Sequence, residues 1–285
     1  MHSLTSSVLV SVYHCVEPEA LRQCLASLKA QTRQPDQIVI VIDGEVSTAL
    51  SELIDGFQNS NSDQTCLVPL AVNGGLITAL NTGLWHCSGD WILRVDADDI
   101  ALPHRFERQL GLLEEDSNID VLGSAMLEFE SDPRKPDRLK PVLESHDEIA
   151  NSIGIRNPIN HPTVCIRKRF LEEAGGYPEL ELLEDYFLWG KLLKLGATFR
   201  NLPEPLYLFR FDDQTLQRRG GASNLDNEVW LRRWMYREKL ISLPTLCFAT
   251  MLQIVLRLAP LNIRRFLWRR SRQIATHSIE LPQDI

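Results

Sequence analysis

Short apolar runs alternate with segments of helical periodicity over the first 130 residues, and this alternation constrains the fold more than any other feature. Four runs are apolar and rich in β-branched residues, at 7–13, 37–42, 65–72 and 90–95. Such runs are typical of strands buried on both faces of a parallel sheet. Apolar residues recur at helical spacing in 18–32, 75–86 and 103–113. The order strand, helix, strand predicts right-handed βαβ units, and so an α/β fold whose central sheet is mostly parallel and flanked by helices.

The alternation ends after Ser131. The segment 131–141 (SDPRKPDRLKP) is rich in proline and charge, which predicts an exposed loop. The later elements that we predict are a strand at 162–167, a helix at 186–195, a strand at 207–211 and mostly helix from 225 onward. We therefore predict one catalytic-type domain over 1–240, with halves of about 1–130 and about 131–240, and a helical appendage at 241–285.

Charge and hydropathy exclude several classes of protein. The chain carries 30 lysines and arginines against 38 aspartates and glutamates, a formal charge of −8, so attraction to phosphate does not make it a nucleic-acid binder. The apolar residues never form the roughly 18-residue uninterrupted stretch that a membrane-spanning helix needs. The N-terminus leads almost at once into a strand-like run and lacks the pattern of a signal peptide.

The cysteines point to a reducing compartment. Six of them, at 15, 24, 66, 87, 165 and 247, show neither a Cys-x-x-Cys pair nor a zinc-like spacing. Most lie in apolar segments, where reduced and buried thiols are expected. Together with the missing signal peptide, this pattern predicts a cytoplasmic protein.

Polar residues follow each of the four predicted strands. The first run ends with Ser11 and Tyr13, which are two residues apart and therefore on one face. The other three end at Asp43-Gly44, at Asn73-Gly74-Gly75 and at Asp96-Ala97-Asp98-Asp99. Each of these alone is usually only a turn former. Because ligands of open parallel sheets bind outside the carboxyl ends of the strands, the four together predict a ligand site.

The acidic cluster after the fourth run indicates a metal. Asp96 and Asp98 are two residues apart at the end of an extended segment, so their carboxylates can point the same way. Carboxylates this close repel each other unless a positive charge lies between them. Mg²⁺ or Mn²⁺, which bind hard oxygen ligands, are the natural candidates. The alternative is a solvated acidic loop in which Asp99 caps the helix near Pro103.

Several segments resemble family 2 glycosyltransferases. The segment GDWILRVDADDIALPHRFERQL resembles the family's core motif, in which an Asp-x-Asp element follows the fourth strand. The opening SVLVSVYHCVEPEALRQCLASLKAQTRQPDQIVIVIDG and the pair Asn73-Gly74-Gly75 and Asn81-Thr82-Gly83 also resemble it. Downstream, HPTVCIRKRFLEEAGGYPE and ELLEDYFLWGKLLKLG resemble the family's acceptor-side region. The resemblance covers about 7–215 and implies a GT-A (Rossmann-like) fold, with a nucleotide-binding half, an acceptor half, and inverting transfer of a sugar from a nucleotide-diphosphate sugar.

The resemblance also implies roles for single residues. The positions that match nucleoside-contacting residues of the family are Ser11, Tyr13 and Asp43. Asn73 matches a position near the nucleotide, and Asp96 one near the ribose and the metal. Asp98 matches the metal-binding aspartate. A metal there would neutralise the charge that develops on the departing diphosphate.

An inverting displacement needs a base that takes the proton of the attacking hydroxyl. The pair Glu184-Asp185 resembles the family's Glu-Asp pair, whose aspartate has this role, which implies Asp185 as the base. Acids at a helix N-terminus are also favoured by the helix dipole alone. His161 resembles a family histidine that lines the site or assists at the metal, and a histidine of the core or of a turn fits equally well.

The sequence departs from the family in two places. Ala79-Leu80 precede Asn81 where the family often has a basic residue, and 217–221 (QRRGG) does not match the Gln-x-x-Arg-Trp motif of processive members. An enzyme that adds a single sugar is therefore favoured over a polymerase. Trp189 and Leu192 are expected in the core rather than at the acceptor.

The C-terminal segment is basic and amphipathic. Between Pro244 and Ala275 there are six arginines and no acid, while 243–258 is largely apolar and 263–272 mixes arginines with large apolar residues. Such a segment can lie in a membrane interface with its arginines near anionic phosphates, here at the cytoplasmic face of the inner membrane through 241–275. Packing of this helix against the catalytic domain is the alternative.

These inferences lead to one hypothesis and two alternatives. The hypothesis is a metal-dependent inverting glycosyltransferase that carries a sugar, with UDP as the expected carrier, to a saccharide or lipid-linked saccharide in surface or exopolysaccharide biosynthesis. One alternative is a nucleotidyltransferase, which is expected to have a glycine- and basic-rich loop after the first strand, unlike 13–17 (YHCVE). The other is an inactive nucleotide-sugar-binding assembly subunit, which would lack Asp98 or Asp185.

Overall fold

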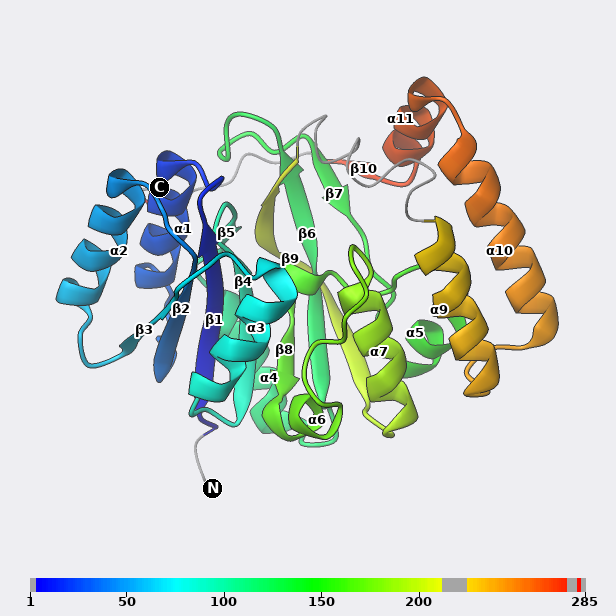
Figure 1. The fold of residues 1–285 in the computed structure, drawn as a ribbon, viewed down its shortest axis with the longest axis horizontal. Helices are drawn as coiled ribbons and strands as arrows, with labels where there is room; N and C mark the ends of the chain where they lie inside the picture. The colour runs from blue at the N-terminus through cyan, green and yellow to red at the C-terminus, as the bar shows by residue number, and fades with distance from the viewer. Residues whose placement is uncertain (1–3, 212–224, 276–280, 283–285) are drawn as a thin grey trace.

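The predicted alternation of strands and helices is present in the computed structural model, which describes residues 4–211, 225–275 and 281–282 (Figure 1). The elements of the first half are β1 (Ser6–Tyr13), α1 (Pro18–Lys29), β2 (Gln37–Asp43), α2 (Thr48–Ser60), β3 (Thr65–Leu70), α3 (Gly75–His86), β4 (Trp91–Asp96), β5 (Ile100–Ala101) and α4 (Arg105–Glu115). The third strand ends at Leu70, two residues before the end of the predicted run.

The second half differs more from the prediction. Its elements are β6 (Val121–Phe129), β7 (Arg138–Lys140), α5 (His146–Ser152), the 3-10 helix η1 (His161–Thr163), β8 (Cys165–Arg167), α6 (Lys168–Glu173), α7 (Glu184–Lys194) and β9 (Phe199–Arg210). The strand predicted at 162–167 begins only at Cys165, because Pro162 sits in the preceding 3-10 turn. The strand predicted at 207–211 is the end of the much longer β9. The loop predicted from 131 includes the short strand β7.

The C-terminal segment is mostly helical, as predicted, and ends in a strand. It comprises α9 (Leu225–Arg237), α10 (Leu243–Leu258), α11 (Leu261–Arg270) and β10 (Gln273–Ile274). The predicted boundary at residue 240 falls in the turn between α9 and α10. The strand β10 pairs antiparallel with β7, so the chain returns to the sheet after α11.

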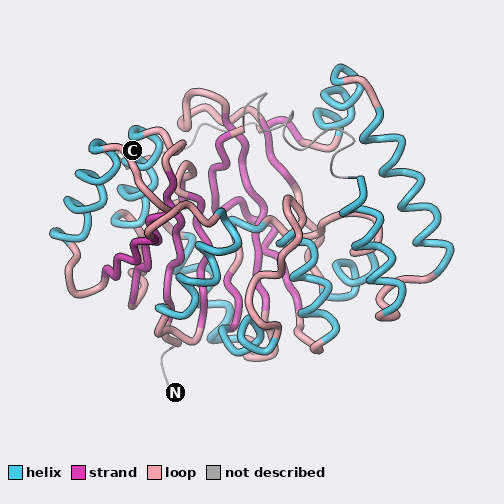
Figure 2. The backbone as a smooth tube through the Cα atoms, viewed as in Figure 1, coloured by secondary structure: helices cyan, strands magenta, loops and turns pink. Residues whose placement is uncertain are grey.

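One mixed sheet forms the centre of the molecule, with helices packed around it (Figure 2). In the described part of the chain the strand order is β10-β7-β6-β8-β4-β1-β2-β3, with β9 paired to β6 and to β5. The strands β1, β2, β3 and β4 are mutually parallel, and β8 joins antiparallel to β4. This curled α/β sheet confirms the predicted fold class.

Two apolar cores cover the two faces of the sheet. One face of β1, with Val8 and Val10, packs on the helices α1, α2 and α4. The opposite face, with Leu9, packs on α3 and on α7, whose Trp189 and Leu192 are fully buried as predicted. Leu21, Leu25 and Leu28 of α1 are buried together, so the helical spacing seen in the sequence marks the core face of that helix.

The cysteines divide evenly between the core and the more open positions. All six are free thiols, and those at 24, 87 and 165 are buried. The cysteines at 15 and 247 are exposed and that at 66 is half-buried, so burial was predicted correctly for only half of them. Within the described ranges, every helix falls short of the length and hydropathy that a membrane crossing needs.

Substitution of Gly83 tests how closely α3 packs on the sheet. A Cβ atom at this position would lie 2.4 Å from Leu9 Cδ1 and 2.6 Å from Val41 Cγ2, whereas one at Gly111 of α4 would meet nothing within 4 Å. We expect Gly83→Ala to lower the free energy of unfolding by about 1–3 kcal/mol through overpacking. Gly111→Ala should raise it by about 0.5–1 kcal/mol, because alanine restricts the unfolded chain. Urea denaturation measures both, and equal stability of the two variants would contradict this account.

Candidate active site

The predicted ligand site forms where β1, β2 and β4 end. The register pairs Ser11 with Asp96 across β1 and β4, and Tyr13 with Asp43 across β1 and β2. The chain enters β1 from the lower edge of the sheet in Figure 1, so these carboxyl ends lie at the upper edge. Ser11 is nearly buried and Tyr13 is exposed. The structure therefore brings four of the predicted residues together at one edge.

Asp43 binds the loop before α3. Its Oδ1 accepts a hydrogen bond from Gly74 N at 2.7 Å, and its Oδ2 accepts one from Gly75 N at 3.0 Å. Asn73 Nδ2 donates to the Asp43 carbonyl at 3.1 Å. Gly44 is required beside this contact, because it has φ +80° and a Cβ atom there would lie 2.5 Å from Asn73 N. Asp43 and Asn73 thus shape the site, and their direct contact with a nucleoside stays a prediction.

The buried guanidinium of Arg94 stabilises the acidic loop that follows β4. The Arg94 guanidinium, 2% exposed, makes an ion pair with the Asp96 carboxylate. Tyr207, fully buried on β9, accepts a hydrogen bond at its Oη from Asp96 N at 3.0 Å. Since Asp96 and Arg94 are two residues apart on one strand, both side chains project from the same face of the sheet.

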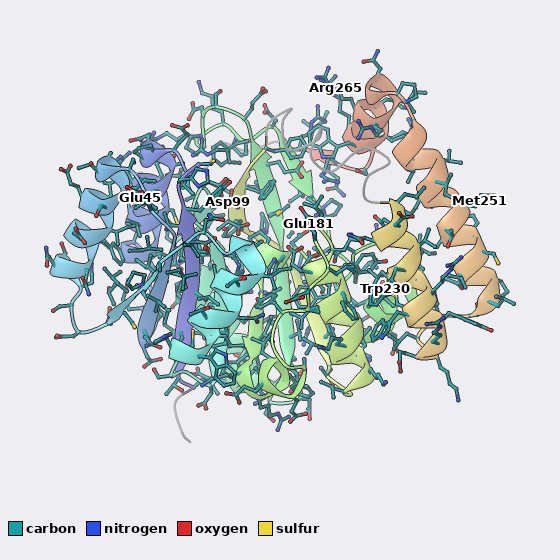
Figure 3. All side chains as sticks on the ribbon, in the orientation of Figure 1. Glu45, Asp99, Glu181, Trp230, Met251 and Arg265 are labelled. Carbon is teal, nitrogen blue, oxygen red and sulfur yellow. The ribbon has the colours of Figure 1, made fainter. Side chains whose placement is uncertain are left out.

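Asp98 and Asp99 differ in their surroundings. The Asp98 side chain is exposed at the rim, yet the protein atoms crowded around it raise its pKa, and the Asp96 carboxylate acts in the same direction. Asp99 is fully buried, and its Oδ1 accepts a hydrogen bond from Arg210 N at 2.7 Å. The alternative that Asp99 caps the next helix is wrong, because His104 is the N-cap of α4 and Asp99 bonds β9 instead. Figure 3 labels Asp99 at the upper part of the sheet.

The predicted base lies at the first turn of α7. Asp185 Oδ2 accepts a hydrogen bond from Asn157 Nδ2 at 2.7 Å, and Oδ1 accepts one from Tyr186 N at 2.6 Å. Burial raises the pKa of Glu184 to about 7, and the neighbouring Asp185 carboxylate adds to the rise. Asn157 was missed by the sequence analysis, because an asparagine in an irregular loop carries no periodicity and its partner lies 28 residues away.

His161 packs against aromatic rings. Its Nε2 lies 3.2 Å from Tyr177 Oη, and its ring stands edge-on to Trp189 with 5.9 Å between centroids. Burial lowers the pKa of His161 well below its usual value, and the nearby Arg94 cation acts in the same direction. A neutral imidazole in an aromatic contact fits the alternative of a core histidine, and a role in lining the site or at a metal stays a prediction.

Arg94 connects the acidic loop with the acids of α7. The positive charge of Arg94 partly opposes the rise in the pKa of Asp98 and the rise in the pKa of Glu184. Such electrostatic interaction is appreciable only over short distances. Residues predicted as the metal-binding and base regions therefore lie within electrostatic range of the same buried cation, although they are separated by more than 80 residues in sequence.

The acids of this edge suit a metal shared with a substrate. In the described part of the chain, no group of three or more His, Cys, Asp or Glu side chains is arranged to hold a metal by itself. Mg²⁺ and Mn²⁺, however, are often bound by one or two carboxylates together with substrate phosphates. The exposed Asp98 with the adjacent Asp96 supplies a donor set of this kind.

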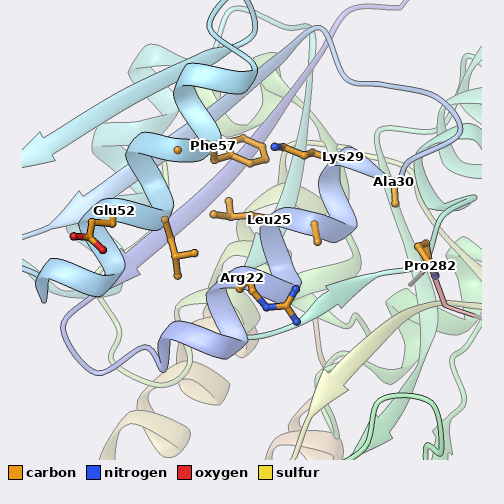
Figure 4. Close-up of a pocket in the computed structure, with 10 residues that line it drawn as sticks. Arg22, Leu25, Lys29, Ala30, Glu52, Phe57 and Pro282 are labelled. Atoms are coloured by element: carbon orange, nitrogen blue, oxygen red, sulfur yellow. The ribbon is translucent and has the colours of Figure 1, made fainter. Parts of the chain in front are cut away.

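One cavity of the described structure lies elsewhere. It has a volume of about 480 Å³ between α1 and α2, where Leu25, Phe57 and Pro282 form part of its wall (Figure 4). None of the predicted site residues lines it. We place the candidate active site at the sheet edge rather than in this cavity, because the cavity lies between α1 and α2, away from the polar residues that follow β1, β2 and β4.

Comparison with protein families gives a match over most of the chain. The model of the family described as "Glycosyl transferase family 2" matches residues 7–175. The amylovoran biosynthesis glycosyltransferase AmsE of Erwinia amylovora is 35% identical over 267 residues, which cover 94% of this chain and 99% of that protein. The Escherichia coli UDP-Gal:alpha-D-GlcNAc-diphosphoundecaprenol beta-1,3-galactosyltransferase is 33% identical, with 93% and 95% covered.

Solved structures share the fold at lower sequence identity. Staphylococcus aureus TarS 1–349 in complex with UDP-GlcNAc superimposes with a TM-score of 0.63 at 19% identity, covering 84% of this chain and 67% of TarS 1–349. The mannosyltransferase PcManGT of Pyrobaculum calidifontis, in complex with GDP-Man and Mn²⁺, gives 0.56 at 17% identity, with 95% and 80% covered. These likenesses support the GT-A type of fold.

Glu184 should make stability fall as the pH rises. A carboxyl whose pKa increases on folding, here from 4.5 to about 7, is favoured in its protonated form in the native state, so the native state loses stability between these values. Glu184→Gln has no proton to lose. We expect the wild type to lose about 2–3 kcal/mol relative to Glu184→Gln between about pH 5 and about pH 8. Urea denaturation at both pH values measures this difference, and a difference that is independent of pH would contradict the assignment.

Proposed function

The chain belongs to glycosyl transferase family 2, and we propose that it transfers a sugar from a nucleotide-diphosphate sugar to a saccharide acceptor with inversion at the anomeric carbon. The observation that carries this proposal is that the acidic loop after β4 and the Glu184-Asp185 pair of α7 lie within electrostatic range of one buried cation, Arg94. Binding of the donor diphosphate needs the acidic loop after β4. Removal of the proton from the acceptor hydroxyl needs the Glu184-Asp185 pair. Nucleotidyl transfer would leave the acids of α7 without a role.

The donor that we propose is a UDP-sugar. The relative from Escherichia coli is named for UDP-Gal, and TarS 1–349 has been solved with UDP and with UDP-GlcNAc. We propose that Ser11, Tyr13 and the loop shaped by Asp43 and Asn73 receive the nucleoside. A divalent Mn²⁺ or Mg²⁺ held by Asp98 and Asp96 would neutralise the charge on the departing diphosphate.

The base in this proposal is Asp185. Its carboxylate accepts the proton of the acceptor hydroxyl while the hydroxyl oxygen forms its bond to the anomeric carbon and the bond from that carbon to the diphosphate breaks. Attack from the side opposite the diphosphate inverts the configuration. The hydrogen bonds from Asn157 Nδ2 to Asp185 Oδ2 and from Tyr186 N to Asp185 Oδ1 hold this carboxylate in place.

The acceptor that we propose is a lipid-linked saccharide of surface or exopolysaccharide biosynthesis. The Escherichia coli relative is named for a diphosphoundecaprenol-linked GlcNAc, and the Erwinia amylovora relative for amylovoran biosynthesis. An acceptor of this kind is confined to a membrane, so the enzyme must work at the membrane surface.

The helices α10 and α11 provide a surface for that contact. Phe248, Met251 and Val255 recur along one face of α10 and are 52%, 60% and 61% exposed. On α11, Ile263, Phe266 and Leu267 are also exposed. Figure 3 labels Met251 and Arg265 on these helices, at the outside of the molecule. Exposed apolar side chains between arginines suit the headgroup region of an anionic bilayer, which we propose to be the cytoplasmic face of the inner membrane.

Two variants separate the roles of the neighbouring acids. Asp185→Asn should leave UDP binding within about twofold of the wild type and lower sugar transfer by about 1,000-fold, because the base is lost. Glu184→Gln should lower transfer far less. Calorimetry and a radiolabelled transfer assay measure the two properties. Transfer by Asp185→Asn at the wild-type rate would remove the base assignment, and a wild type that binds the donor without transfer would indicate an inactive assembly subunit.

The membrane contact is tested in the full-length chain. The double variant Met251→Glu and Phe266→Glu should bind vesicles of phosphatidylglycerol and phosphatidylcholine about tenfold more weakly, since it removes two apolar insertions and adds two like charges. Trp85→Glu, which changes a 79% exposed tryptophan on α3, is the matched control and should bind as the wild type does. Sedimentation with vesicles measures binding. Equal partitioning of the double variant and the control would rule out this surface.

A further inference from the structure

Arg210, the last residue of β9, binds the acidic loop through both its main chain and its side chain. Its amide donates to Asp99 Oδ1 at 2.7 Å, and its side-chain Nε donates to the Asp98 carbonyl at 3.0 Å. Its Nη2 donates to Gln23 Oε1 of α1 at 2.8 Å, and the guanidinium lies 4.7 Å from the centroid of the Phe129 ring. One side chain therefore connects the acidic loop with α1 and β6.

The rest of β9 supports the same loop. Tyr207 Oη accepts from Asp96 N at 3.0 Å, so the loop is bonded to β9 at its beginning. After Asp99, β5 continues the loop and pairs antiparallel with β9, with Ile100 opposite Leu208. The loop is thus fixed to β9 before, at and after Asp98, and Arg210 provides the bond at Asp98 itself.

The C-terminal segment holds the end of β9 in place. Phe211, which follows Arg210, stacks on Trp268 of α11 with 4.3 Å between ring centroids and 6° between the planes. Arg272 Nε donates to both carboxylate oxygens of the buried Glu128 at 2.9 Å. Glu128 lies on β6 opposite Phe209 of β9. Contacts of α11 and of the turn after it therefore brace the strand end that carries Arg210.

We propose that Arg210 is a positioning residue that fixes the orientation of the acidic loop for the diphosphate of the donor, and that Trp268 supports it from the C-terminal segment. This inference rests on the proposed function. It makes 261–274 part of the catalytic unit, whereas the sequence suggests a separate appendage. The Asp98 carbonyl and the Asp98 side chain belong to one residue, so a bond to the carbonyl limits the directions in which the carboxylate can point.

The test measures nucleotide binding, which does not depend on the acceptor. We expect Arg210→Ala to bind UDP about tenfold more weakly than the wild type by calorimetry in the presence of Mn²⁺, because a charge-assisted hydrogen bond to the loop is lost. Arg210→Lys should fall between the two, since one ammonium cannot reach both the Asp98 carbonyl and Gln23 in the same geometry. Trp268→Ala should also weaken binding, and to a smaller extent than Arg210→Ala.

Arg108→Ala is the matched control. Arg108 Nε bonds Glu204 of β9 at 3.0 Å, and both side chains are exposed, so this variant removes an arginine contact to the same strand away from the acidic loop. It should bind UDP as the wild type does. Thermal denaturation of all variants identifies any loss of folded protein. Such a loss would lower the number of binding sites and leave the dissociation constant of the folded fraction unchanged.

The outcomes separate this inference from the proposed function. Wild-type affinity in folded Arg210→Ala, or in folded Arg210→Lys if the alanine variant does not fold, would overturn the role of Arg210 and leave glycosyl transfer intact. Equal weakening in Arg108→Ala would overturn it as well, because the effect would then be general to β9. A wild type that binds neither UDP nor GDP with Mn²⁺ would overturn the proposed function together with this inference.

Discussion

The ion pair between Arg94 and Asp96 is the interaction on which the candidate site depends. Five acids, at 96, 98, 99, 184 and 185, gather around the end of β4 and the start of α7, and carboxylates at such distances repel each other. Arg94 is buried and lies within range of both groups, so its charge offsets part of this repulsion. Because breaking a buried ion pair leaves an uncompensated charge, the sheet edge can carry its acids only while Arg94 is in place.

Much of the first half could be predicted from the sequence, because its signals are local. Strands buried on both faces have continuous apolar runs, and the polar residues that end them necessarily meet at one edge when the strands are parallel. The pairing of Ser11 with Asp96 and of Tyr13 with Asp43 follows from that rule. In the second half β8 and β9 are paired with distant strands, and their bounds were predicted less well.

Two supporting residues of the site could not be predicted, because each acts through a contact that is distant in sequence. Arg210 meets Asp98 across 112 residues and Asn157 meets Asp185 across 28. Arg94 had a visible signal that the sequence analysis did not use: after Asp90, it is the one charged residue inside the apolar run 90–95. A charge in a strand that is buried on both faces requires a buried partner, and Asp96 follows two residues later.

The C-terminal segment makes contacts with the domain, whereas its contact with a membrane stays a prediction. Trp268 and Arg272 point toward the sheet and meet Phe211 and Glu128, as expected for a helix packed on the domain. Met251, on α10, is exposed and makes up part of the surface that we propose for membrane contact. The segment contacts the sheet through Trp268 and Arg272 and exposes apolar side chains along α10 and α11. It can therefore connect the edge of the sheet that carries the acids with a surface where a lipid-linked acceptor would lie.

A crystal structure of the full chain with UDP and Mn²⁺ tests the central claim most directly. The account predicts an anomalous manganese peak beside the Asp98 carboxylate, with the diphosphate bound to the same ion and the uridine near Ser11 and Tyr13. Nucleotide bound in the cavity between α1 and α2, with no manganese at Asp98, would contradict it.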